Sequence, residues 1–204
     1  FDNQVTRTKL RPLARGSIPT STAVGLLGVM LLMSLLIIIF LPGESTTLCL
    51  AIALLALPAI LLYPSAKRWF AYPQAILAIC WGFAVLIPWA ASESSLLGGA
   101  PLLSCWGATV VWTFGFDTVY AMADSKEDKQ LGLKSSVLSL GKKTIKTVAI
   151  SYAMACLLLA IGAYNAGVTL IFWPFWAIAT LSMQRETWSL YSSKFSISTF
   201  GRHF

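Results

Sequence analysis

The chain has 204 residues, of which 57% are apolar and only 11% are charged. Ordinary globular proteins are about 45–50% apolar and about 25% charged, so this composition excludes a water-soluble fold of this size. The formal net charge is +7, and every Lys and Arg lies outside the long apolar stretches. The composition therefore predicts a membrane protein.

Six blocks without Asp, Glu, Lys, Arg or His follow one another along the chain. Each block is 17 to 20 residues long, enough to cross a hydrocarbon core of about 30 Å as a helix. Helices satisfy their own backbone polar groups where water is absent. We therefore expect one all-α domain over residues 1–204, a polytopic membrane bundle. The predicted spans are 22–41, 47–63, 74–91, 98–116, 147–164 and 167–183.

The charges predict the orientation of these spans. If the spans cross in turn, all 15 Lys and Arg residues fall on one membrane face, and the other face carries only Glu44 and Glu93. The positive-inside rule makes the basic face cytoplasmic, with both chain ends on that side of the plasma membrane if the source is bacterial. Six of the eight acidic residues share the basic face. Such mixed charge suggests a site for a metal-bound anion.

Several functional classes are disfavoured. The four cysteines lie singly in four different blocks, which is typical of buried thiols, and the single histidine, His203, leaves no material for a zinc site or a His-based triad. The basic residues have no soluble domain to organise them for nucleic-acid binding. A membrane transporter is the alternative from another class, but the block centres lack the charges that mark an ion pathway.

The segment 116–141 carries the chemistry. Asp117, Asp124 and Asp128 lie within about 40° of one another on a continuing helix. The outer two are about 16 Å apart along it, too far to share one ion. Mg²⁺ is usually held by one or two carboxylates plus substrate phosphates, so a row of ligands facing a polyanion fits the spacing. A solvated helix end, with its acids paired to lysines, is the structural alternative.

A short internal match supports the site. Asp2-Asn3-Gln4-Val5 is echoed by Asp128-Lys129-Gln130-Leu131, with Lys9 and Lys134 following. Four spans separate the two copies, so both lie on the same face. Two such elements across one cavity would hold a diphosphate through metal on one side and basic side chains on the other.

Three motifs resemble one known family. Residues 117–128 match DxxYAxxDxxxD and lead into GLKSS, residues 1–13 read FDNQVTRTKLRPL, and residues 63–74 read YPSAKRWFAYPQ. These resemble, respectively, the second aspartate-rich motif and GxKS segment, the end of the first motif with its RTKxRPL run, and the YPxxKR…PQ loop of the UbiA superfamily of intramembrane prenyltransferases. The wording DTVYAMxD is closest to the 4-hydroxybenzoate polyprenyltransferases. Of the first motif's acids, only Asp2 is present.

The resemblance implies about nine spans of bilayer-crossing length, against six here, so we expect a fragment that lacks N- and C-terminal helices and is inactive alone. It implies Mg²⁺-dependent transfer of a polyprenyl group from its diphosphate to the ring of 4-hydroxybenzoate, in quinone biosynthesis. Other acceptors remain open, namely homogentisate, a naphthoate, chlorophyllide or haem.

Roles for single residues follow from the resemblance. The implied catalytic residues are Asp117, Asp124 and Tyr120, the last as a ring that stabilises a carbocation. The implied Mg²⁺ ligands are Asp2, Asp117, Asp124 and Asp128, the last also a candidate for holding a basic neighbour. The implied partners of the diphosphate or the acceptor carboxylate are Lys126, Lys134, Lys67, Arg68, Arg7 and Arg11, with Lys126 and Lys134 favoured for the diphosphate.

Overall fold

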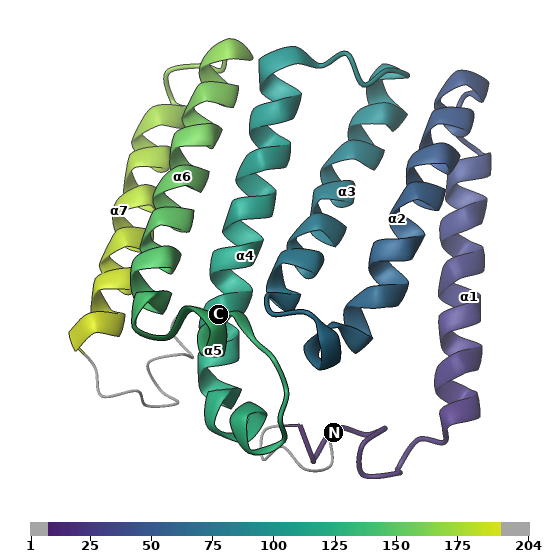
Figure 1. Ribbon diagram of the computed structural model, residues 1–204. Helices are drawn as coiled ribbons and strands as arrows, with labels where there is room; N and C mark the ends of the chain where they lie inside the picture. The colour runs from purple at the N-terminus through teal and green to yellow at the C-terminus, as the bar shows by residue number, and fades with distance from the viewer. Residues whose placement is uncertain (1–7, 193–204) are drawn as a thin grey trace.

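Residues 8–192 are described by a computed structural model, and the regular secondary structure in them is helical (Figure 1). A five-residue helix α5 (Ser136–Leu140) and a 3-10 turn η2 (Gly141–Lys143) join the fourth and fifth of six long helices. In Figure 1 the long helices stand side by side in the order α7, α6, α4, α3, α2, α1. The expected all-α bundle is confirmed. The long helices are α1 (Thr20–Ile39), α2 (Gly43–Trp69), α3 (Pro73–Glu93), α4 (Gly99–Gln130), α6 (Thr144–Asn165) and α7 (Phe172–Ser192).

Local sequence explains where the helices depart from the predicted blocks. Helix α1 stops at Ile39, two residues before the block ends, because the residue that precedes Pro42 is disfavoured in helical conformation. After α6, Gly167 adopts a positive φ of 66°, a conformation that interrupts a helix and suits glycine. Helix α7 therefore begins at Phe172 instead of residue 167.

The surface of the bundle suits a lipid environment. Helix α1 has no buried residue, although it is almost entirely apolar. A contiguous apolar surface of this size is foreign to water-soluble monomers. Within residues 8–192, four helical stretches are long and apolar enough to cross a membrane: Thr20–Ile39, Gly43–Trp69, Pro73–Glu93 and Ser136–Asn165. Helices α4 and α7 lie in the same row as these four (Figure 1).

Small residues allow the helices to approach closely. A side chain at Gly115 of α4 would lie 2.9 Å from the Tyr152 ring of α6 and 3.0 Å from the Ser151 Cβ. Close approach at glycines is typical of membrane helix pairs, which gain stability from van der Waals packing. Next to this point, a buried cluster joins α4, α6 and α7. Its members are Val119, Met122, Val148, Tyr152 and Leu190.

The two ends of the bundle differ in charge. The α1–α2, α3–α4 and α6–α7 connections lie together at one end, and the α2–α3 connection, the end of α4 and α5 lie at the other (Figure 1). Each Lys and Arg among residues 8–192 belongs to the second end, whereas Glu44 and Glu93 flank the first. The alternation on which the charge argument depended is thus present in the described residues.

Candidate active site

Helix α4 carries the predicted acidic row. The helix continues for 14 residues past the apolar block at 98–116, ending at Gln130. Asp117, Asp124 and Asp128 therefore share one helix face, and Tyr120 lies beside them. Asp124 is 4% exposed and Asp128 only 1% exposed. Buried carboxylates need partners or ligands, so this face is built for polar chemistry.

The acidic row lines a cavity of about 550 Å³ at the basic end of the bundle. Its walls come from α2, the start of α3, α4 and the segments 8–11 and 133. Carboxylates on α4 share the space with three cationic side chains and two tyrosines. The lining residues are Thr8, Arg11, Tyr63, Pro64, Lys67, Arg68, Pro73, Gln74, Asp117, Tyr120, Ala121, Asp124, Asp128 and Leu133.

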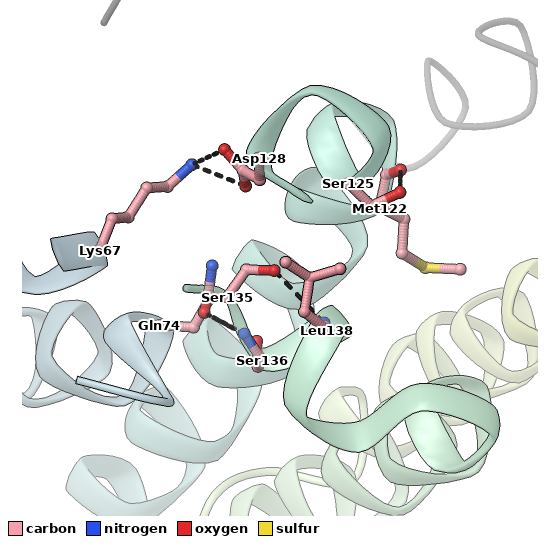
Figure 2. Close-up of polar contacts among 8 residues, drawn as sticks. All are labelled: Lys67, Gln74, Met122, Ser125, Asp128, Ser135, Ser136 and Leu138. Carbon is pink, nitrogen blue, oxygen red and sulfur yellow. Dashed lines mark hydrogen bonds and ion pairs between the residues drawn. The ribbon is translucent and has the colours of Figure 1, made fainter. Parts of the chain in front are cut away.

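An ion pair joins the ends of α2 and α4. The Lys67 Nζ donates to both oxygens of Asp128, at 3.2 and 3.1 Å (Figure 2). Burial raises the pKa of the Asp128 carboxyl, while Lys67 opposes that shift and Asp124 and Glu127 add to it. Because both oxygens of Asp128 accept from Lys67, its side chain is engaged as a partner of a basic neighbour.

The GLKSS segment turns the chain back under the cavity. Gly132, with φ of 67°, allows the Leu133 N–H to bond the Asp128 carbonyl and the Gly132 N–H to bond the Lys129 carbonyl, a Schellman ending for α4. Leu133 is then buried on the cavity wall. The Lys134 N–H bonds the Lys67 carbonyl at 2.7 Å, which ties the segment to α2.

A buried polar network lies behind the cavity. The Gln74 Oε1 accepts from both the N–H and the Oγ of Ser136, each at 2.8 Å (Figure 2). The Ser136 Oγ also lies 2.9 Å from the Thr118 Oγ1. Gln74 is 2% exposed, and both hydroxyl residues are fully buried. The network joins the starts of α3 and α5 to α4.

Some residues named from the sequence lie elsewhere. Lys126 is exposed and does not line the cavity. The Lys134 Nζ donates instead to the Trp69 carbonyl at 2.9 Å, so Lys134 braces the end of α2. Asp2 and Arg7 lie outside the described residues. The structure brings together Asp117, Tyr120, Asp124, Asp128, Lys67, Arg68 and Arg11.

Two further lining residues received no role from the sequence. Tyr63 and Gln74 both belong to the YPSAKRWFAYPQ stretch that carried one of the motifs. A search for charged residues passes over them because both side chains are neutral. Their position at the two ends of a motif was the available signal.

The donor set fits Mg²⁺ held jointly with a substrate. Asp117 and Asp124 present carboxylate oxygens, which Mg²⁺ prefers, to the same cavity. Within residues 8–192, no three acidic, His or Cys side chains come close enough to form a metal site by themselves. Mg²⁺ is commonly bound through one or two carboxylates with substrate phosphates completing the coordination, so two carboxylates are sufficient here.

The fold and the cavity define an integral membrane protein with a charged site at one end of a helical bundle. The pattern described as "UbiA prenyltransferase family" matches residues 1–196. The chain belongs to the UbiA prenyltransferase family. Its fold agrees with the apo structure of a UbiA homolog from Aeropyrum pernix K1, with a TM-score of 0.77 at 26% identity, covering 99% of this chain and 74% of that one.

Two curated proteins are similar to this chain in sequence. The 4-hydroxybenzoate solanesyltransferase of a Synechocystis species is 45% identical over 154 residues, which are 76% of this chain and 51% of that protein. The 4-hydroxybenzoate octaprenyltransferase of Dechloromonas aromatica is 35% identical over 188 residues, or 90% of this chain and 60% of that protein. The chain thus spans about half of the first relative's length and three-fifths of the second's.

Proposed function

We propose that the protein containing this chain transfers a polyprenyl group from polyprenyl diphosphate to the ring of 4-hydroxybenzoate, with Mg²⁺, in quinone biosynthesis. The observation that carries the proposal is the cavity in which Asp117 and Asp124 face Lys67, Arg68 and Arg11. A cavity with both signs of charge suits a metal-bound diphosphate. The names of the similar proteins direct the choice of acceptor.

The reaction breaks the allylic C–O bond of the donor and forms a C–C bond at the ring carbon ortho to the acceptor hydroxyl. That carbon then loses its proton to solvent, and inorganic diphosphate leaves. Bound Mg²⁺ would neutralise the negative charge that develops on the leaving group. Asp117 and Asp124 would hold the ion, with Asp2 as a further predicted ligand.

The remaining cavity residues would bind the anionic groups of the substrates and stabilise the allylic cation. Arg68 and Arg11 lie on the cavity wall as cationic partners for phosphate or carboxylate oxygens, where a guanidinium can bind two oxygens at once. The ring of Tyr120 would stabilise the allylic cation by about 0.5–2 kcal/mol. Neither Lys126 nor Lys134 lines the cavity in the described residues. Their role as diphosphate ligands stays a prediction.

The test uses membranes that contain the full-length protein to which residues 1–204 belong. We expect a labelled polyprenyl group to reach 4-hydroxybenzoate with Mg²⁺ present and not with a chelator. Asp117→Asn and Asp124→Asn should each lower turnover about 10²-fold or more, as expected for lost electrostatic stabilisation. Glu93→Gln, at the opposite end of the bundle, is the matched control and should retain turnover.

Two results would contradict the proposal. Unchanged turnover in both aspartate variants would remove them as metal ligands. A panel of aromatic acceptors assayed with one polyprenyl diphosphate identifies the true acceptor, and a preference for homogentisate, a naphthoate, chlorophyllide or haem over 4-hydroxybenzoate would replace the substrate proposed here.

A further inference from the structure

Gln74 is a neutral polar residue of the cavity, and hydrogen bonds set the orientation of its side chain. It lies in the first turn of α3, is 2% exposed, and lines the cavity. Its carbonyl oxygen receives two hydrogen bonds of 2.8 Å from Ser136. Two bonds from one residue in a neighbouring segment hold the amide group at a fixed angle.

The donors in this network determine which end of the amide is which. The Ser136 backbone N–H can only donate, so the Gln74 atom that it meets must be the oxygen. The Ser136 hydroxyl has one proton, which it gives to the same oxygen, and it therefore accepts from the Thr118 hydroxyl. The chain of bonds runs in one direction, from Thr118 through Ser136 to Gln74.

The amide nitrogen of Gln74 consequently points the other way. In Figure 2 the nitrogen lies on the side away from Ser136 and toward Lys67 and Asp128. Among residues 8–192 the structure gives this nitrogen no hydrogen-bond partner. The nitrogen is not fully buried either, and because Gln74 lines the cavity, the amide N–H is accessible from the cavity. A fixed N–H donor facing a charged cavity is a ready-made contact for an acceptor oxygen.

We propose that Gln74 is a substrate-binding residue whose amide N–H donates to an anionic oxygen of a bound substrate. The inference rests on the proposed function for the identity of that substrate. Two oxyanions share the required chemistry, the diphosphate of the donor and the carboxylate of the aromatic acid. The cavity offers either of them cations from Lys67, Arg68 and Arg11, and Gln74 adds a directional bond without adding charge.

Gln74→Glu is the decisive variant. The new carboxylate still accepts both bonds from Ser136, so the network behind the cavity is retained, but its second oxygen now repels an anion instead of donating to it. Thr118→Val is the matched control, because it removes the far end of the same network from a fully buried position that does not line the cavity. If Gln74 served only to hold this network, Thr118→Val would weaken ligand binding at least as much as Gln74→Glu.

Binding is measured separately from turnover, on the full-length protein in detergent. Calorimetry follows farnesyl thiolodiphosphate, which resists ionisation, and separately 4-hydroxybenzoate. Hydrogen bonds to charged groups are worth about 1.5–3 kcal/mol, so Gln74→Glu should weaken one of the two ligands about 10- to 100-fold, while Thr118→Val stays within about twofold. The weakened ligand identifies the oxygen that Gln74 contacts, and its KM should rise more than kcat falls.

The outcomes separate this inference from the proposed function. Weaker binding in Gln74→Glu without prenyl transfer by the wild-type protein would support the inference and reject the function. Prenyl transfer by the wild-type protein, with Gln74→Glu binding both ligands as the wild type does, would overturn the inference. Equal losses in Gln74→Glu and Thr118→Val would also overturn it.

Discussion

Lys67 and Asp128, which both line the cavity, form an ion pair whose two partners have different exposures. The Lys67 side chain is 38% exposed, whereas that of Asp128 is only 1% exposed. Lys67 can therefore lose its partner and return to water, but Asp128 cannot. The carboxylate is the member of the pair that depends on the interaction.

This asymmetry predicts a pH-dependent stability. Because burial raises the pKa of Asp128, the folded protein holds the proton more tightly than the unfolded chain. Stability should therefore fall as pH rises from the usual aspartate pKa through the raised one, where the folded carboxyl ionises. Asp128→Asn lacks this titration, so the wild type should gain stability relative to it on acidification.

Thermal unfolding in detergent with chelator, followed across pH, measures the effect. The control is Lys67→Met, which removes the attraction that opposes the raised pKa and should move the window to higher pH. If the difference in unfolding temperature between the wild type and Asp128→Asn did not vary with pH, the raised pKa of Asp128 would be contradicted.

At the scale of the element, α4 depends on close packing against α6. An added Cβ at Gly115 would lie 2.9 Å from the Tyr152 Cε1 and 3.0 Å from the Ser151 Cβ, and the latter is fixed to the backbone. Gly107 on the same helix would meet only the Leu158 Cδ1, at 3.3 Å, the far end of a flexible side chain. Two glycines of one helix thus differ in what surrounds them.

Gly115→Ala should destabilise the protein by about 1–3 kcal/mol, the usual cost of overpacking a tight interface. Gly107→Ala should be close to neutral, because the side chain in its way can turn aside and alanine favours the helix by about 0.5–1 kcal/mol. Unfolding midpoints in detergent compare the two variants, and equal midpoints would show that the interface can yield.

The sequence predicted the elements better than the contacts between them. The 7 and 4 spacing of the aspartates anticipated that α4 continues beyond the apolar block, because only a helix places them on one face. It could not show that Lys134 would donate to the Trp69 carbonyl, since that bond depends on how the end of α2 meets the GLKSS turn. Gln74 and Ser136 are 62 positions apart and meet only in the folded bundle.

For the whole molecule, orientation in the membrane is the main prediction still to be tested. Leu97, in the α3–α4 connection, is 96% exposed, and Lys142 lies in η2 at the basic end. Single cysteines at these positions, with the four native cysteines replaced by alanine, would report the two faces. An impermeant maleimide should label Leu97→Cys in intact cells and Lys142→Cys only after permeabilisation, by the positive-inside rule. The opposite pattern would invert the topology and place the cavity outside.

The length of α4 has a consequence for how the reaction products part. Its last 14 residues extend about 20 Å past the apolar block, which carries the aspartates out of the hydrocarbon into the watery boundary layer. In the reaction proposed, inorganic diphosphate is then released straight into solution, while the alkylated phenol stays dissolved by its tail in the lipid. The two products leave into different phases, and this separation hinders their recombination.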